Sequence, residues 1–524
     1  MMKSKKILAA VLAAVMAVVP LASCSGGKTA SSGKENGKTA ASDTIIYAQG
    51  ADPRGLDPAL VDDGESGKII VNIYEGLLKY NKDSTKVEPS LAESWDVSKD
   101  GLSYTFHLRK GVKFQDGTDF NAEAVKYNID RQLPDKATED MSYAGFVYGA
   151  VKDVEVVDEN TVKINLKTPS TPFLNNLAMC MAAPIISPTA LKKYNNNVNE
   201  HPVGTGPYTF VSWTKSQNVV LTRNDNYWGD KAKIKNVIFK FIPDNSARVV
   251  ALNNGEADLI DGIDSTVVDQ IKQGGGQIFQ SPGMSTNYLA SNVTKSPTKD
   301  VEVRKAIAQA INVPELVKSL YKGYAETATS ILPTFMAGYD KSISQVAYDP
   351  DAAKKAFAAK GITSLHMITY TNPRPYNPAN GQALAEAVMG YLDKVGVKCQ
   401  LDSYDWATYK EKIKAGDYDV CFYGWIGDNG DPDNFMNLLS DQDPTMNVAR
   451  YNNSKFNEGI QKAVAMPEGN ERSKAYTDLE KMAAADAVWV PISHATNLIA
   501  YRPNVKGFVY HMTGVIFLSQ ATKG

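Results

Sequence analysis

The sequence predicts an α/β protein of more than one domain, and three observations support this prediction. From Val301 onward, apolar residues recur alternately at strand spacing and at helix spacing. The first half instead carries two hairpin patterns, each with a polar turn between two alternating stretches. About 480 residues remain after an N-terminal leader, and a single hydrophobic core usually stops growing well below that length.

Short strands dominate the first half. Alternation of apolar and polar residues marks them, and polar turns separate the paired ones. The predicted strands are 44–49, 103–108, 154–166 with a turn at 158–160, 208–221 with a turn near 215–217, and 237–242. Helical spacing predicts helices at 68–78, 121–131 and 246–253, and Asn121 suits the N-cap of the second.

The second half alternates strand and helix. The predicted helices are 303–311, 350–360, 380–395 and 406–415, and the predicted strands are 365–370, 397–401 and 418–425. Asn312 and Pro314 are expected to end the first of these helices. This order is the βαβ pattern of an open α/β sheet.

The leader has the features of a bacterial secretion signal. Lysines open the chain, and the apolar run 7–20 follows, which is shorter than the ~20 residues that span a bilayer. Residues 21–24 (Leu-Ala-Ser-Cys) resemble the lipobox of bacterial lipoproteins, which implies removal of 1–23 and lipidation of Cys24. An ordinary secreted protein with an incidental cysteine is the alternative. We therefore expect an extracytoplasmic protein, lipid-anchored to the bacterial cell membrane.

Residues 24–43 are predicted to be the lipidated cysteine and a flexible tether. The stretch is rich in Gly, Ser, Thr, Ala and Lys and has too little apolar bulk to build a core. About 18 such residues span roughly 20–25 Å as a random coil. Lipid chains contribute about 0.8 kcal/mol per buried CH₂, so two chains could hold the protein at the membrane.

Charge and cysteine usage exclude other classes. The chain has 56 basic and 58 acidic residues, so no basic surface for nucleic acid is expected. Besides Cys24, three widely spaced cysteines remain, which is no disulfide framework. Cys421 lies in an apolar run and is expected to be a buried small hydrophobe.

The motifs of common exported enzymes are missing from the sequence. None of the five histidines forms an HExxH pair, and no GxSxG elbow or phosphate-binding loop is present. Asp428, Asp431 and Asp433 invite a calcium interpretation, but the glycine and glutamate of an EF-hand loop are absent at the required spacing. We therefore predict no catalytic residue, no metal and no cofactor.

Three separated regions are similar to one family. These are 92–118, 203–208 with 224–229 (NDNYWG), and 303–307. They resemble the family-five extracytoplasmic solute-binding proteins of ABC importers, and the similarity runs from about Thr44 to the C-terminus. The resemblance implies a two-lobe periplasmic-binding-protein-like (type II) fold with an extra inserted domain. The implied divisions are 44–75, 203–283 and 495–524 for lobe I, 76–202 for the inserted domain, and 284–494 for lobe II.

Two further stretches resemble the dipeptide-binding branch of this family. They are 374–378 (RPYNP) and 424–435 (GWIGDNGDPDNF). The resemblance implies that Arg374 binds a peptide carboxylate, that Asp428 binds the α-ammonium, and that Trp406 is a pocket aromatic. The remaining expected ligand contacts are Tyr376, Trp425, Gly427 and Gly64. The loop 62–65 departs from the pattern, because hydroxyl residues are expected there.

A general peptide receptor must read both ends of a zwitterion. The planar guanidinium fork of Arg matches a carboxylate, and an Asp supplies the counter-charge for an ammonium. The ends of an extended dipeptide lie roughly 6–7 Å apart, so two fixed charges would select its length. Gly424, Gly427 and Gly430 were further expected to let the ligand backbone approach closely.

Alternatives remain open at this stage. Asp428 lies in a Gly/Asn/Asp turn and could simply form that turn, Arg374 could be a surface charge, and Trp406 could belong to the core. The expected partners are a dipeptide or short peptide and the ABC permease subunits, with no nucleic acid, and we expect a monomer. Glutathione, haem or a peptide signal are other possible ligands for the same fold, and an exported hydrolase is the last alternative.

Overall fold

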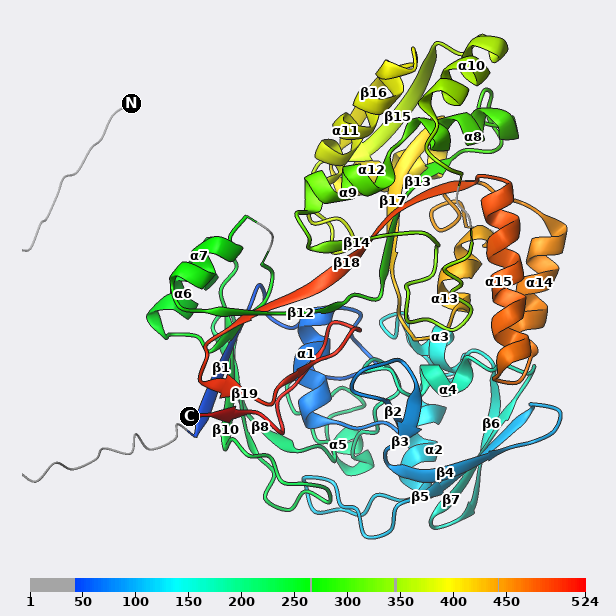
Figure 1. Ribbon diagram of the computed structural model, residues 1–524. Helices are drawn as coiled ribbons and strands as arrows, with labels where there is room; N and C mark the ends of the chain where they lie inside the picture. Colours follow the sequence, from blue (N-terminus) through cyan, green and yellow to red (C-terminus); the bar gives the residue numbers. More distant parts are fainter. Residues whose placement is uncertain (1–42, 264–265, 344–345, 442) are drawn as a thin grey trace, which may run out of the picture. The chain divides into compact units, whose positions relative to one another are not determined.

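The computed structural model describes residues 43–263, 266–343, 346–441 and 443–524. The leader, Cys24 and the tether up to Ser42 lie outside the described residues. Within the described part, twelve strands form one mixed sheet (Figure 1). Its main path runs β16-β15-β17-β13-β18-β11-β1-β10-β9-β8, and β12 and β14 pair with β18. The predicted α/β class is therefore confirmed.

The strands of this sheet come from almost the whole described chain. They are β1 (Thr44–Gln49), β8 (Tyr208–Thr214), β9 (Asn218–Arg223), β10 (Asn236–Phe241), β11 (Leu259–Ile260), β12 (Gln277–Pro282), β13 (Ser285–Ser291), β14 (Ala325–Thr327), β15 (Ser364–Tyr370), β16 (Lys398–Tyr404), β17 (Val420–Ile426) and β18 (Trp489–Tyr501). A separate sheet has the order β4-β5-β7-β6, with β4 (Ala92–Val97), β5 (Ser103–Leu108), β6 (Val151–Asp158) and β7 (Thr161–Leu166). Both predicted hairpins, β6–β7 and β8–β9, are confirmed.

β18 connects two parts of the large sheet. Its first residues pair with β13, as Ala290 faces Trp489, and its last residue, Tyr501, pairs with β11 and with β12. The first seven residues of β18 are all buried, which a strand inside a mixed sheet requires. Figure 1 shows β18 running from the neighbourhood of β13 to that of β1.

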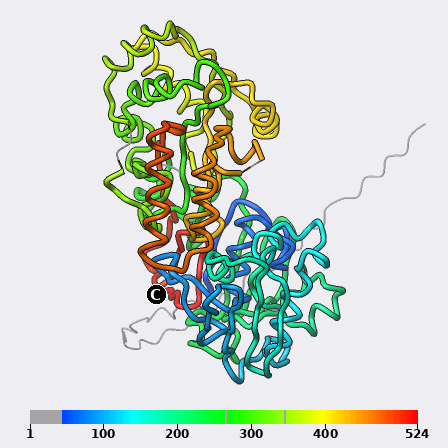
Figure 2. The backbone as a smooth tube through the Cα atoms, turned by 90° about the vertical axis from the view of Figure 1, so that its right-hand side faces the viewer, coloured from blue at the N-terminus to red at the C-terminus, as the bar shows by residue number. Residues whose placement is uncertain are grey.

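Helices cover the sheets. The helices of eight or more residues are α1 (Gly64–Ile73), α2 (Ala122–Asp130), α6 (Asn245–Asn254), α8 (Val301–Ala310), α9 (Val313–Tyr321), α10 (Pro350–Lys360), α11 (Gly381–Lys394), α12 (Trp406–Ala415), α14 (Ser454–Ala465) and α15 (Asn470–Ala485). α14 and α15 pack against each other, as Figure 2 shows. Among the described residues, no helix is both long and apolar enough to cross a bilayer.

The start of α1 differs from the prediction, and α9 was not predicted. α1 begins at Gly64 rather than at Lys68, because Asp63 accepts a hydrogen bond from the N–H of Ser66 and caps the helix there. The helix predicted at 303–311 does end before Asn312, because α8 stops at Ala310. Asn312 and Pro314 also begin α9, which the sequence did not predict: Asn312 caps it and the proline lies in its first turn. The predicted cap at Asn121 is confirmed, since its side chain accepts from the N–H of Ala124.

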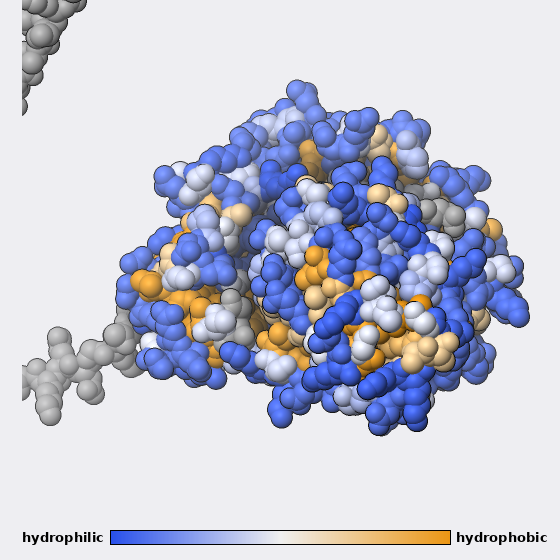
Figure 3. Space-filling view, turned by 90° about the horizontal axis from the view of Figure 1, so that it is seen from above, coloured by the Kyte–Doolittle hydropathy of each residue, from blue (hydrophilic) through white to orange (hydrophobic). Residues whose placement is uncertain are grey.

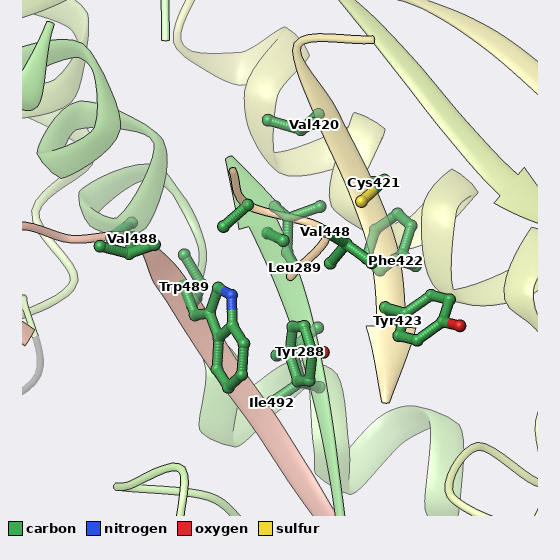
Figure 4. Close-up of a cluster of buried hydrophobic side chains, with 14 of the residues drawn as sticks. Tyr288, Leu289, Val420, Cys421, Phe422, Tyr423, Val448, Val488, Trp489 and Ile492 are labelled. Carbon is green, nitrogen blue, oxygen red and sulfur yellow. The ribbon is translucent and has the colours of Figure 1, made fainter. Parts of the chain in front are cut away.

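Buried apolar residues form three large clusters. One cluster packs between the strands and helices of 284–492, a second lies around the β4-β5-β7-β6 sheet, and a third lies around β1, β8, β9 and β10. Figure 4 shows part of the first, where Tyr288 stacks on Trp489 with ring centroids 3.7 Å apart. Cys421 is fully buried there, as predicted. The lobe and insertion boundaries stay a prediction.

Candidate functional site

Three loops that carry predicted ligand residues leave the same edge of the sheet. β15 pairs in parallel with β16 on one side and with β17 on the other. Arg374 follows β15, Trp406 follows β16, and Asp428 follows β17. In an open α/β sheet, the loops at the carboxyl ends of parallel strands form the usual ligand site. The βαβ order therefore brings together residues that are far apart in the sequence.

Asp428 is held by hydrogen bonds at both its backbone and its carboxylate. Its N–H donates to Asn434 Oδ1 (3.0 Å), and its carboxylate accepts from Tyr143 Oη (2.5 Å) and from Asn434 Nδ2 (3.2 Å). Burial raises the pKa of Asp428, and the hydrogen bonds from Tyr143 and Asn434 oppose that rise. No Lys, Arg or His of the described residues forms an ion pair with this carboxylate.

The other acids of the Asp428 loop have structural roles. Asp431 accepts two hydrogen bonds from the Arg472 guanidinium, both at 2.7 Å, and both side chains are buried. Burial raises the pKa of Asp433, and the nearby Asp431 charge raises it further. Among the described residues, no group of three or more His, Cys, Asp or Glu side chains is arranged to hold a metal ion. Asp428 thus stands apart from the other acids of its loop.

Arg374 is held in a tight loop by its own backbone. Arg374 and Asn377 exchange N–H···O bonds of 3.1 and 2.8 Å, and the buried Asn377 side chain bonds the hydroxyls of Tyr321 and Tyr370. The guanidinium carbon of Arg374 lies 3.9 Å from the centre of the Trp406 ring, a cation–π contact. The Arg374 side chain forms no ion pair with any described carboxylate, and its Nε is buried without a hydrogen-bond partner.

The remaining predicted aromatics pack around these charges. Trp406 lies against Tyr370, Tyr409 and Tyr423, with ring centroids 5.7–5.8 Å apart. Tyr376 is buried, and its hydroxyl has no hydrogen-bond partner in the described residues. Trp425 is half-buried and donates from Nε1 to Asn434 Oδ1 (2.8 Å). Trp425 and Asp428 therefore share Asn434 as a support.

The space beside the three glycines is filled by the protein itself. A Cβ on Gly424 would lie 2.3 Å from the Tyr376 ring, and one on Gly427 would lie 2.7 Å from Phe435. A Cβ on Gly430 would lie 2.1 Å from Thr85. These side chains account for glycine at the three positions, and the expected close approach of a ligand backbone stays a prediction.

A cavity of about 670 Å³ opens beside Asp428. Of the predicted ligand residues, Asp428, Gly427 and Gly64 line it. Arg374, Trp406, Tyr376 and Trp425 are not among its lining residues, although Pro375, next to Arg374, is. The volume lies within the ~300–1,000 Å³ that is usual for small-molecule sites. The two predicted charges are thus placed differently, one in the wall of the cavity and one beside it.

The first turn of α1 contributes charged groups that the sequence did not single out. Glu65 and Lys68 line the cavity, and Lys68 Nζ lies 3.1 Å from Glu65 and also bonds the buried Asp261. Burial alone would lower the pKa of Lys68, but Asp261 and Glu65 raise it above its usual value. Lys68 is 193 residues from Asp261 in the chain, so the sequence could not predict their contact. Its position among the buried residues of α1 was the one local sign that Lys68 is buried.

Two further lining residues were also missed. Tyr143 lines the cavity and donates to Asp428 from the region around the β4-β5-β7-β6 sheet. His511 lines it too, but its Nε2 lies 3.1 and 3.2 Å from the carbonyls of Asn81 and Ser84, and its Nδ1 lies 2.8 Å from Thr513 Oγ1. Burial lowers the pKa of His511. Both of its ring nitrogens are therefore engaged within the protein.

Comparisons with known proteins find one family and a solved structure of similar fold. Residues 86–447 match the family described as "Bacterial extracellular solute-binding proteins, family 5 Middle". Heme-binding protein A of Haemophilus influenzae is 33% identical, over 96% of this chain and 96% of its own. The dipeptide-binding protein of Escherichia coli is 32% identical, over 90% of this chain and 93% of its own. The ABC transporter-associated periplasmic binding protein DppA from Helicobacter pylori, solved in complex with the peptide STSA, is 30% identical with a TM-score of 0.74, over 92% of this chain and 98% of that one.

Proposed function

The chain belongs to the bacterial extracellular solute-binding proteins of family 5, and we propose that it captures short peptides outside the membrane for an ABC importer. Membership supports the binding of a solute rather than catalysis. Two similar proteins carry peptide-binding names or a bound peptide. The observation that carries the proposal is the Asp428 carboxylate, which lines a cavity, is half-buried, and has no cationic partner among the described residues.

In this proposal, Asp428 binds the α-ammonium of the peptide. A buried carboxylate without a counter-charge is destabilised, and a ligand cation would relieve that cost. Tyr143 and Asn434 leave the carboxylate oriented, so the ammonium meets a fixed acceptor. In the same proposal, Arg374 binds the carboxylate at the other end of the peptide. Its guanidinium lies over Trp406 and has no carboxylate partner in the described part of the chain.

Arg374 reaches the peptide only if its side chain or its loop turns toward the cavity. Pro375, the next residue in this loop, already lines the cavity. Family membership supplies the mechanism, because two-lobe binding proteins close around their ligands by hinge motion. The predicted division into lobe I, an inserted domain and lobe II is part of this proposal.

Isothermal titration calorimetry with Ala-Ala and N-acetyl-Ala-Ala tests the ammonium contact. Acetylation removes the charge that Asp428 would pair with and leaves the carboxylate of the peptide unchanged. We expect the free dipeptide to bind and the acetylated one to bind about 150- to 5,000-fold more weakly, which corresponds to about 3–5 kcal/mol for an unpaired buried charge. Equal affinity for the two ligands would contradict the assignment of Asp428.

Membrane attachment through Cys24 is also part of the proposal. It is supported by the Leu-Ala-Ser-Cys stretch at 21–24, which lies outside the described residues. Replacing Cys24 with Ser should move the protein from the membrane fraction to the soluble fraction of cells. Mass spectrometry of the N-terminal peptide would identify acyl chains on the native protein, and an unmodified Cys24 would contradict the anchor.

Haem is the second candidate ligand. It is favoured by the name of the Haemophilus influenzae relative and by a cavity whose 670 Å³ exceeds what a dipeptide with small side chains fills. Against it, the lining histidine His511 has both ring nitrogens engaged. Absorption spectra of the protein titrated with haemin would separate the candidates, because an axial protein ligand changes the Soret band.

A further inference from the structure

Sulfur-containing side chains are concentrated on the wall of the cavity. Met179, Cys180, Met181, Met284 and Met512 all line it. The described residues contain twelve of the fifteen methionines of the chain, so one cavity holds a third of them. Methionine has three rotatable bonds and a polarisable sulfur, and proteins use it where a surface must adapt to different apolar partners.

These side chains form two groups, one beside Asp428 and one against α1. Met284 lies beside Asp428: its carbonyl accepts from the N–H of Gly427 (2.8 Å), and its own N–H donates to the carbonyl of Met512 (3.2 Å). Cys180 and Met181 instead lie against α1, where a Cβ on Gly67 would be 3.2 Å from Cys180 Sγ and 3.7 Å from Met181 Cε.

Part of this apolar wall remains uncovered. Large apolar residues that are at least one-third exposed number eight among the described residues, and two of them, Ile426 (43%) and Phe517 (38%), line the cavity. Cys180 and Met181 are also partly exposed. The surface in Figure 3 is mostly hydrophilic with scattered apolar areas, so exposed apolar side chains gathered in a cavity indicate a surface that a ligand covers.

We propose that this wall is a side-chain site for a large apolar residue, an aromatic one above all, at the N-terminal position of the bound peptide. The proposal rests on the proposed function, because Asp428 fixes the N-terminus and the exposed Ile426 of the same wall lies two residues before it in the chain. Thioether sulfurs contact aromatic rings favourably, and flexible thioethers can adapt to rings of different shape. Met179, Met284 and Met512 are buried and belong to the packed part of the wall, whereas Met181, which also lines the cavity, is partly exposed.

Calorimetry with Phe-Ala, Ala-Phe and Ala-Ala tests this site. Burying the phenyl ring should make Phe-Ala bind about tenfold more tightly than Ala-Ala, and Ala-Phe should gain less because its ring is at the other position. If none of the three peptides binds, the proposed function fails. If all three bind equally, or if Ala-Phe binds most tightly, peptide binding stands and the side-chain site is overturned.

A variant and a chemical probe locate the site. Met181→Gln keeps the length of the side chain and adds polarity, so it should lower the ratio of Phe-Ala to Ala-Ala affinity at least threefold. Met389→Gln, on α11 and away from the cavity, is the matched control and should leave the ratio unchanged. Mass spectrometry after mild peroxide treatment should show that Phe-Ala protects Met181, but not Met389, from sulfoxide formation. An unchanged ratio together with no protection of Met181 would overturn the proposal.

Discussion

The loop after β17 fixes a carboxylate by hydrogen bonds, whereas the loop after β15 fixes a guanidinium on an aromatic ring. Asp428 is in the cavity wall with Tyr143 and Asn434 bonded to it. Arg374 is beside the cavity, with its charge over Trp406. The first arrangement is directional and leaves little freedom to the carboxylate. A cation over a ring can slide or turn at small cost, so the second arrangement suits a group that moves when the ligand arrives.

Removing the Asp428 charge should have the largest effect on peptide affinity. Asp428→Asn keeps the shape of the side chain and removes the counter-charge for the ammonium, so Ala-Ala affinity should fall by about 3–5 kcal/mol. Thermal unfolding of the ligand-free variant should be unchanged or higher, because burial already disfavours the charged form of Asp428. Glu411→Gln, an exposed acid on α12, is the control. If Asp428→Asn bound Ala-Ala as tightly as the wild type, the result would contradict the proposed role of Asp428 and its comparison with Arg374.

Removing the Arg374 charge should have a smaller effect on peptide affinity. Arg374→Ala should lower Ala-Ala affinity by about 1.5–3 kcal/mol, the usual contribution of a hydrogen bond to a charged group. Arg374→Lys should recover only part of it, because Lys lacks the planar fork. Calorimetry with C-terminally amidated Ala-Ala provides the control. The wild type should bind the amide more weakly than Ala-Ala, whereas Arg374→Ala should bind the two peptides with equal affinity.

Removing the aromatic support should have a weaker effect again. Trp406→Leu takes away the cation–π contact but keeps an apolar side chain, so affinity should fall by about 1 kcal/mol. Trp213→Leu is the matched control, because Lys215 Nζ lies 3.1 Å over the Trp213 ring at a site that does not line the cavity. An equal loss in the two variants would show that the effect of Trp406 comes from folding rather than from positioning Arg374.

The smallest change concerns pH. Binding of an ammonium requires ionised Asp428, so affinity should fall as pH drops through its raised pKa. The ligand-free protein should respond oppositely at this site: the raised pKa favours the protonated folded form, so stability falls as pH rises through it. Tyr143→Phe removes a hydrogen bond that lowers this pKa and should move the midpoint of binding to higher pH, with a loss of at most about 1 kcal/mol at neutral pH. Tyr348→Phe, an exposed tyrosine, should leave the profile unchanged.

Local patterns predicted the loops that surround the site. Strand and helix periodicity identified β15, β16, β17 and the helices between them, and motif resemblance selected Arg374, Trp406 and Asp428. Parallel pairing of the three strands then follows from the βαβ order, which is why these residues end at one edge of the sheet. The sequence could therefore place Asp428 and Arg374 on loops at one edge of the sheet, and their joint contact with a ligand stays a proposal.

Long-range contacts were beyond sequence reasoning. Tyr143 is 285 residues from Asp428, and nothing around it distinguishes it from other half-buried tyrosines. Gly424, Gly427 and Gly430 were interpreted as room for a ligand, because a sequence shows that space is needed but not what fills it. The methionines of the cavity are likewise scattered over more than 300 residues and form a group only in the folded chain.

The position of β18 affects when the protein can fold during its synthesis. In the described structure, β12 and β14 pair only with β18, and β11 and β13 each need it along one edge. β18 is made after every strand that it pairs with, because residues 489–501 follow β11, β12, β13 and β14 in the chain. Until then the large sheet has open edges and stays incomplete. An exported chain that crosses a membrane unfolded gains time from this order, because β12 and β14 lack their partner until β18 has been made.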